Sequence, residues 1–240
     1  MYRKIPVLLL NNRGFVKGKN FSKHRYIGDP INIVRIFNEK QVDEICILDI
    51  SRSNKSDCIK YDVLAEICSE AFMPLSYGGG IRSIQQAEQV LRSGAEKIIF
   101  NTAAFSNPEL IRAAVSIFGS STILVNIDVR FFTNDYYCYS FGGQHFTHIK
   151  AISHAKYMER LGVGEIMVTS IDKEGTKSGC DLALIDLISS AVSVPIIASG
   201  GVGSKHDFKL AFDAGASAIG AGSYFCFYGD LDGVLITYDV

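Results

Sequence analysis

The amino-acid sequence predicts an α/β fold, a (β/α)₈ TIM barrel that is built from two homologous half-barrels. Eight short apolar runs alternate with helix-like segments along the 240 residues. Segments of the first half recur in the second half at a constant spacing of about half the chain. Polar side chains follow several expected strands, where barrel proteins place their functional loops. An open, doubly wound sheet has the same alternation, but eight nearly continuous units favour closure.

The strands and helices can be placed in order from local patterns. We expect N-caps at Asp29, Ser83 and Asn107, because these residue types accept hydrogen bonds from the first turn of a helix. Proline follows the first and the last of them, as is common at the first helical position. Gly94 is expected to end the helix that Ser83 begins, and residues 227–240 are expected to form a short helix and a tail. The expected strands are 5–10, 44–50, 74–77, 97–101, 122–128, 165–170, 195–199 and 217–222.

An internal repeat supports the two half-barrels. "PLSYGGGIRS" and "PIIASGGVGS" align without a gap, so that Pro74 falls on Pro195. The same spacing places Thr102 on Ser223 and "VDEICILDI" on "VGEIMVTSI". We therefore predict a single domain over 1–240, with half-barrels of about 1–120 and 121–240.

Composition excludes several classes of function. The 24 Lys and Arg nearly balance the 25 Asp and Glu, which argues against nucleic acid or an anionic membrane as a partner. No segment is long and apolar enough to span a membrane, and the N-terminus lacks a signal peptide's features. Six irregularly spaced cysteines indicate reduced thiols in a cytoplasmic protein. Five scattered histidines, expected to be exposed, predict no metal site. No cofactor is expected.

Two glycine turns, "GGG" at 78–80 and "SGG" at 199–201, each follow a strand and precede a helix. Glycine lets backbone N–H groups approach an anion, and barrel phosphate sites commonly lie in such loops. Turns without a ligand are the alternative, but two matching turns favour a ligand with a phosphate at each end. The candidate residues are Gly79, Gly80, Asn101 and Thr102 in the first half and Ser199, Gly200, Gly201, Gly222 and Ser223 in the second.

Other polar residues lie at the expected carboxyl ends of strands. Asp128 is our candidate general acid/base, although a carboxylate that only holds a neighbouring loop is the alternative. The loop "SIDKEGTKSGCD" is too rich in acid and glycine for a plain connector. Lys17, after the first strand, could screen a phosphate or cover the site. Further candidates for substrate binding are Asp49, Thr169, Glu174 and Gly175.

The opposite ends of four strands carry charges of alternating sign. These residues could form a closed ring of ion pairs at the barrel floor. Because that face of a barrel usually serves stability, the residues alone favour an ordinary stabilising cluster of salt bridges. They are Arg3, Glu44, Lys97 and Glu165.

Several longer motifs point to one family. "GDP" at 28–30, "DEICILDI", "GGGIRS", "NTAA", "TSIDKEGTKSGCD" and "ASGG" together resemble the cyclase subunit of imidazole glycerol phosphate synthase, HisF, over nearly the whole chain. The sister isomerase shares the half-barrel repeat, but would not be expected to carry "NTAA" or "TSIDKEGTKSG". The resemblance implies a separate HisH-like glutaminase partner at the N-terminal face of the barrel. Ammonia would pass from it through the barrel to a phosphorylated small-molecule substrate.

The resemblance also implies roles for individual residues. The four alternating charges match the family's ammonia gate, and Lys17 and the phosphate candidates match as well. Asp128 matches one of two catalytic aspartates. The other position holds Leu9, which cannot transfer a proton, and such a loss typically costs about 10²–10⁴ in rate. Glu174 stands where the family usually has Asp.

Three functions follow, in order of preference. The start "PVLLL" resembles a divergent HisF-like branch, which implies acetamidino-sugar formation for surface polysaccharide such as lipopolysaccharide O-antigen. The second is the ordinary histidine-pathway cyclase, a lyase that converts PRFAR and ammonia to imidazole glycerol phosphate and AICAR. The third is a catalytically silent conduit that passes ammonia to another protein.

Overall fold

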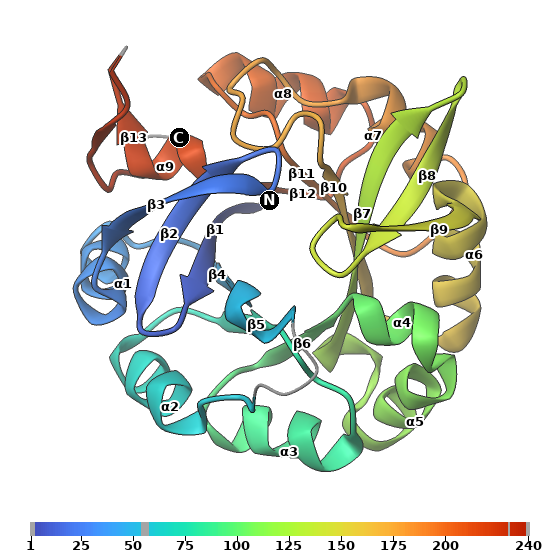
Figure 1. The fold of residues 1–240 in the computed structure, drawn as a ribbon, viewed down its shortest axis with the longest axis horizontal. Helices are drawn as coiled ribbons and strands as arrows, with labels where there is room; N and C mark the ends of the chain where they lie inside the picture. Colours follow the sequence, from blue (N-terminus) through green and yellow to red (C-terminus); the bar gives the residue numbers. More distant parts are fainter. Residues whose placement is uncertain (1–2, 54–57, 230, 239–240) are drawn as a thin grey trace.

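The computed structural model describes residues 3–53, 58–229 and 231–238, which form a closed barrel surrounded by helices (Figure 1). In this part of the chain each barrel strand pairs in parallel with the next, and the last pairs with the first. The predicted fold class is confirmed, and each expected strand overlaps an observed one. The eight barrel strands are β1 (Arg3–Asn11), β4 (Ile45–Asp49), β5 (Leu75–Gly78), β6 (Lys97–Phe100), β7 (Ile123–Phe132), β10 (Glu165–Ser170), β11 (Ile196–Ser199) and β12 (Ala218–Ala221).

The strand order determines which strands face each other. β1 and β7 are four places apart in the closed order β1-β4-β5-β6-β7-β10-β11-β12, so they lie on opposite sides of the barrel axis. Residue 9 of β1 and residue 128 of β7 therefore come from opposing walls. The division into two half-barrels stays a prediction from the sequence repeat.

Helices follow the strands and pack on the outside of the barrel, as Figure 1 shows. Their apolar faces and the outward faces of the strands enclose the larger core, between barrel and helices. The helices are α1 (Pro30–Glu39), α2 (Tyr61–Glu70), α3 (Ile84–Arg92), α4 (Thr102–Ser106), α5 (Pro108–Phe118), α6 (Ala151–Leu161), α7 (Leu182–Ser189), α8 (Lys205–Asp213) and α9 (Ser223–Cys226), with short 3₁₀ turns η1 (Ile50–Ser53) and η2 (Ser120–Thr122). No helix in the described residues is long and apolar enough to cross a membrane.

The expected helix ends are mostly confirmed. The Asp29 side chain accepts a hydrogen bond from the N–H of Asn32 at 3.1 Å, and Ser83 accepts one from Gln86 at 3.2 Å. α3 ends just before Gly94. Asn107 occupies the N-cap position of α5, but its side chain makes no capping hydrogen bond. That part of the prediction is wrong, because Asn107 also ends α4, and its backbone is set by two adjoining helices.

Two hairpins extend the sheet beyond the barrel and were not expected from the sequence. β2 (Gly14–Lys19) and β3 (Ser22–Gly28) continue antiparallel from β1. β8 (Asp135–Ser140) and β9 (His145–Lys150) continue in the same way from β7. Because β1 and β7 face each other, the two hairpins lie on opposite sides of the barrel mouth (Figure 1).

The C-terminal segment differs from the expected helix and tail. After α9 it forms a small hairpin of β13 (Phe227–Tyr228) and β14 (Gly233–Val234). The N–H of Leu235 donates to the carbonyl of Cys226 at 3.0 Å. The two arms of the segment therefore pair backbone N–H and C=O groups with each other, as a helix would do within itself. The Tyr238 hydroxyl then donates to the carbonyl of Lys4 at 2.8 Å, which ties the segment to the first strand.

One histidine is buried, contrary to the expectation that all are exposed. His154 on α6 stacks on Phe105 with ring centroids 4.0 Å apart, and burial lowers its pKa to about 4. It is therefore a neutral packing residue at physiological pH.

Candidate functional site

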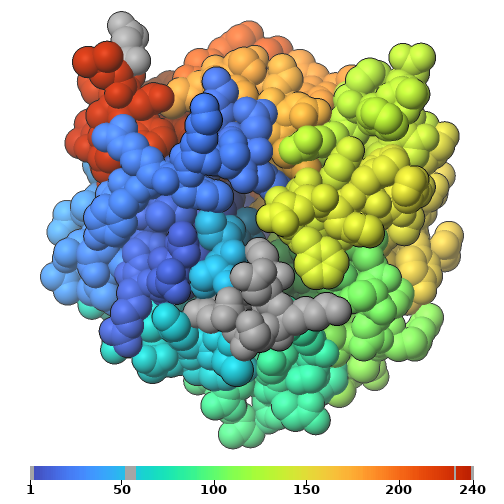
Figure 2. All heavy atoms as spheres, viewed as in Figure 1, coloured from blue at the N-terminus to red at the C-terminus, as the bar shows by residue number. Residues whose placement is uncertain are grey.

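A cavity of about 820 Å³ opens at the carboxyl ends of the barrel strands. Figure 2 looks onto this end of the barrel and shows the surface hollowed between the blue N-terminal hairpin and the yellow-green β8–β9 hairpin. Ten of the residues singled out in the sequence line it: Leu9, Asp49, Gly79, Gly80, Asn101, Thr102, Asp128, Thr169, Glu174 and Ser199. The residues that line it do not include Lys17, Gly175, Gly200, Gly201, Gly222 and Ser223.

Asp128 is buried at the end of β7 and is held by two amide side chains. Asn126 Nδ2 donates to Asp128 Oδ1 at 2.9 Å, and Asn101 Nδ2 donates to Asp128 Oδ2 at 2.9 Å. The Asn126 amide is itself oriented, because its carbonyl oxygen accepts from the Thr169 hydroxyl at 2.9 Å. The carboxyl group therefore has a fixed position and faces the cavity.

The surroundings of Asp128 raise its pKa to about 7. Burial is the main cause, because it disfavours the charged form, and the nearby Glu174 carboxylate acts in the same direction. The hydrogen bonds from Asn126 and Asn101 oppose the rise. A carboxyl group with a pKa near the working pH can both take and give a proton, which suits a general acid/base.

The wall opposite Asp128 is apolar where the resemblance would place a second carboxylate. Leu9 lines the cavity together with Val7 and Leu48, and it lies beside Leu48 in the register of β1 and β4. Residues 3, 5, 7 and 9 alternate with outward-facing positions, so they share the inner face of β1. At this end of that face the chain offers no group that can transfer a proton.

The first glycine turn is open to the cavity. Gly79 packs so closely on β4 that an added Cβ would lie 2.5 Å from the carbonyl oxygen of Asp49. Gly80 and Thr102 continue the same wall. The Thr102 hydroxyl accepts a hydrogen bond from the N–H of Phe141 at 3.1 Å, which joins this wall to the β8–β9 hairpin. The arrangement leaves room for an anion above the turn.

The second glycine turn is covered. A Cβ on Gly222 would lie 1.9 Å from Lys17 Nζ, so the ammonium group lies directly against that backbone. Lys17 Nζ lies 3.0 Å from Glu174 Oε1, and its side chain is 0% exposed. The buried hydroxyl of Ser223 has no hydrogen-bond partner among the described residues. The expected role of Lys17 in screening a phosphate or covering the site stays a prediction.

Asp49 has a supporting position at the cavity wall. Its Oδ1 accepts a hydrogen bond from the Ser51 hydroxyl at 2.6 Å, and its Oδ2 accepts one from the Tyr77 hydroxyl at 3.1 Å. With both oxygens engaged, Asp49 fixes the end of β4, and a direct contact with a ligand stays a prediction.

Reasoning from the sequence missed several residues of the cavity, among them Asn126, His24 and Phe141. Asn126 precedes Asp128 by two residues, so strand alternation alone would have placed both on one face. His24 and Phe141 reach the cavity from the hairpins, which no barrel pattern indicates. Partial burial, followed by the charge of Lys17, lowers the pKa of His24.

The four alternating charges at the floor form a closed ring of ion pairs. Arg3 Nη1 lies 2.8 Å from Glu44 Oε2, and Arg3 also pairs with Glu165. Lys97 Nζ lies 2.8 Å from Glu165 Oε2 and 3.6 Å from Glu44 Oε2. Burial raises the pKa of Glu44, whereas Lys97 and Arg3 lower it. The role of the ring as a gate stays a prediction.

Between this floor and the cavity the barrel interior is mainly apolar, and the buried Ser76 hydroxyl beside Cys46 donates to the carbonyl of Ile45 at 3.3 Å. Along β1, Ile5 and Val7 separate Arg3 from Leu9 on one face, and along β10, Met167 separates Glu165 from Thr169. From floor to mouth, the barrel interior therefore has three layers: the charged ring, a mainly apolar middle layer and the polar cavity. The apolar layer consists of Ile5, Val7, Cys46, Ile99, Leu124, Met167, Ile197 and Ala218.

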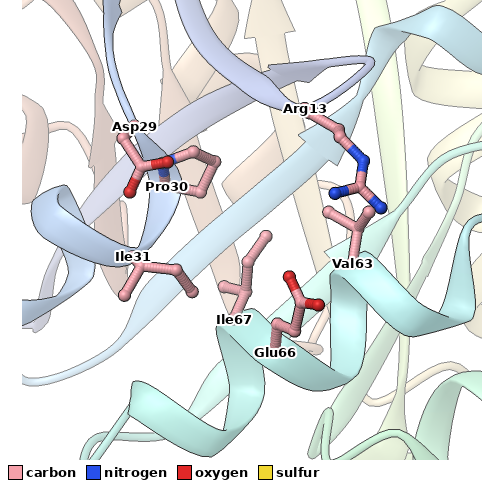
Figure 3. Close-up of a pocket in the computed structure, with 7 residues that line it drawn as sticks. All are labelled: Arg13, Asp29, Pro30, Ile31, Val63, Glu66 and Ile67. Atoms are coloured by element: carbon pink, nitrogen blue, oxygen red, sulfur yellow. The ribbon is translucent and has the colours of Figure 1, made fainter.

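A second, smaller pocket of about 110 Å³ lies between α1 and α2 (Figure 3). Arg13 at its rim pairs with Asp62 at 3.1 Å, and both side chains are largely exposed. The pocket contains no predicted site residue. Its lining residues are Arg13, Asp29, Pro30, Ile31, Val63, Glu66 and Ile67.

Known proteins resemble this chain over almost its whole length. The family described as "Histidine biosynthesis protein" matches residues 3–232. A Pseudomonas aeruginosa protein, provisionally named imidazole glycerol phosphate synthase subunit hisF2, is 43% identical over 238 residues, which cover 98% of this chain and 95% of the relative. Imidazole glycerol phosphate synthase subunit HisF of Thermococcus onnurineus is 41% identical over 223 residues, with 93% and 88% coverage. A provisionally named HisF of Leptospira interrogans is 40% identical over 239 residues, with 98% and 94% coverage.

Proposed function

The chain belongs to the histidine biosynthesis family as a HisF-type protein, and from this premise we propose that it is the synthase subunit of a glutamine-dependent amidotransferase. In this proposal a HisH-like glutaminase docks at the floor of the barrel and releases ammonia there. The ammonia crosses the barrel to a phosphorylated acceptor in the cavity. The acceptor reaction is the conversion of an acetamido group to an acetamidino group for surface polysaccharide.

The layered interior carries this proposal. Ammonia is small and neutral, so it can cross an apolar layer, whereas an ammonium ion would lose its hydration without a partner. The carboxylates of Glu44 and Glu165 can hold an ammonium ion at the floor. Together with Arg3 and Lys97 they can let neutral ammonia pass into the barrel interior. The apolar layer then leads to the cavity that Asp128 faces.

Asp128 supplies the proton transfers in the cavity. Its carboxylate can accept a proton from the attacking nitrogen, and the resulting acid can give that proton to the carbonyl oxygen. A second transfer of the same kind lets the oxygen leave as water and the C=N bond of the acetamidino group form. A pKa of about 7 makes both forms accessible near neutral pH. The Asn126 and Asn101 amides keep the carboxyl group in place through both steps.

Leu9 favours this reaction over the ordinary cyclase reaction of the HisF proteins. Conversion of PRFAR and ammonia to imidazole glycerol phosphate and AICAR would use a second acid/base group opposite Asp128, and Leu9 occupies that wall. The open first glycine turn and the intact Asp128 support the cyclase as the alternative. A catalytically silent conduit to a third protein is a further alternative, which the apolar wall at Leu9 also supports.

Reconstitution with the glutaminase tests the proposal. The HisH-like glutaminase is expected to hydrolyse glutamine about tenfold faster when this chain is added, as coupling between sites of this kind typically gives. Arg92 pairs with Glu88 on the exposed surface of α3, so Arg92→Met serves as a control that should stimulate as well as the wild type. Absence of both binding and stimulation would contradict the docking of a glutaminase at the floor.

A further inference from the structure

The two glycine turns, although related by the sequence repeat, differ in their access to the cavity. Gly79, Gly80 and the following pair Asn101 and Thr102 all line it, and Arg82 is a further lining residue of the same wall. Of the corresponding described residues of the second turn, Ser199 alone lines the cavity. The remaining counterparts lie behind Lys17 and the loop 171–181.

Lys17 fills the space in front of the second turn. Its Nζ lies where a side chain of residue 222 would begin, and no part of its side chain is exposed. A buried ammonium group needs an anion close by, because burial without one is strongly unfavourable. Glu174 provides that anion at 3.0 Å, on the side that faces the cavity.

The backbone of Glu174 is fixed in the position that this contact needs. Its carbonyl oxygen accepts a hydrogen bond from the N–H of Asn20 at 2.9 Å. The Asn20 amide also donates to the carbonyls of Ile171 and Asp172 at 3.1 and 2.8 Å. A Cβ on Gly175 would lie 2.2 Å from the carbonyl oxygen of Gly18, so the loop and the β2–β3 hairpin are in direct contact.

We propose that the cavity takes an acceptor with a single phosphate, held at the first glycine turn, because the Glu174 carboxylate already occupies the anionic position at the second. This inference names the acceptor class of the proposed function and rests on it. A second phosphate would have to displace Glu174 from Lys17. It would also place roughly two more negative charges next to the carboxyl groups of Glu174 and Asp128. Next to Glu174 the cavity wall includes the apolar side chains of Val7 and Leu9, which suit an uncharged end of the acceptor.

Ser223 is a potential hydrogen-bond donor to an anion at the second glycine turn. Its hydroxyl is buried and without a hydrogen-bond partner, next to the glycine that Lys17 contacts. If Glu174 lost its charge, Lys17 and the Ser223 hydroxyl could both turn to a phosphate. The closure therefore depends on one carboxylate, and a single substitution tests it.

Equilibrium dialysis of the full chain against radiolabelled inorganic phosphate measures the number of sites. We expect the wild type to bind one phosphate, and Thr102→Ala to weaken that binding. Glu174→Gln is expected to bind a second phosphate, with affinity for it raised at least about tenfold over the wild type. The double variant Glu174→Gln with Ser223→Ala should lose most of that gain.

Two equivalent phosphates on the wild type would overturn the proposal, and so would none. A single phosphate on a folded Glu174→Gln variant would overturn the role of Glu174. If that variant fails to fold, Glu174→Asp replaces it. Its shorter side chain withdraws from Lys17 but keeps its charge, so a smaller gain in the same direction is expected. The measurement needs no glutaminase, ammonia or acceptor, so its failure is distinct from a failure of ammonia transfer.

Discussion

Asn126 and Asp128 lie two residues apart on one face of β7 and are joined by a hydrogen bond of 2.9 Å from Asn126 Nδ2 to Asp128 Oδ1. The bond favours the charged carboxylate, whereas burial favours the neutral acid. The balance sets the pKa of Asp128 at about 7. A small change in this pair should therefore change how the carboxyl group titrates.

Replacing Asn126 should raise the pKa of Asp128 further. Asn126→Ala removes one of two donors that stabilise the carboxylate and leaves the burial in place. The measurement is an NMR titration of ¹³C-labelled aspartate carboxyl groups, in which Asp128→Asn identifies the resonance by its loss. A pKa that stays the same or falls would show that Asn126 does not control the titration.

Asp128 should make the stability of the protein depend on pH. Its pKa is about 7 in the folded protein, against an ordinary value of 3.8 for an aspartate in an unfolded chain, so between these values the folded state binds more protons than the unfolded state. Stability is then present at low pH and is lost as pH rises through the folded pKa. Relative to Asp128→Asn, the wild type should lose free energy of unfolding between about pH 5 and about pH 8. Urea denaturation at both pH values measures it, and an unchanged difference would contradict the assigned pKa.

The barrel fold and part of the cavity lining could be predicted from the sequence. Strand alternation and the repeat placed Asp128 and the first glycine turn correctly, because strand ends in a closed barrel share one face. The contact between Lys17 and Glu174 joins residues 157 positions apart through a hairpin that the barrel pattern does not encode. Nothing in the spacing showed that the second glycine turn is covered. His24 and Phe141 were missed for the same reason, since they reach the cavity from hairpins.

Breaking the floor ring should cost more stability than breaking a surface pair. Among the described residues, Lys97→Met leaves Glu165 and the buried Glu44 with Arg3 as their one cationic partner, which should lower the free energy of unfolding by about 1–3 kcal/mol. The exposed pair of Arg92 and Glu88 gives the control, since Arg92→Met should cost less than about 1 kcal/mol. Chemical denaturation of the two variants compares them. Equal costs would mean that the ring behaves as ordinary surface charge.

Restoring the cyclase reaction should need two substitutions. The wild type and Leu9→Asp alone are expected not to rescue a cyclase-deficient bacterium on medium without histidine, because Glu174 still excludes a second phosphate. Leu9→Asp combined with Glu174→Asp restores the acid/base group and opens the second turn, and it is expected to give growth. Leu9→Asn with Glu174→Asp is the control, because it has similar size but no group that transfers a proton. Rescue by the wild type would contradict both the assigned role of Leu9 and the single-phosphate cavity.

The most direct measurement is the composition of the surface polysaccharide in a strain from which this gene has been deleted. Cells grown with amide-¹⁵N glutamine, with and without the gene, are compared by mass spectrometry of the released sugars. We expect ¹⁵N in acetamidino groups of the parent strain, their replacement by acetamido groups after deletion, and recovery when the gene is returned. An unchanged polysaccharide together with a new requirement for histidine would contradict it and would assign the chain to the ordinary cyclase reaction.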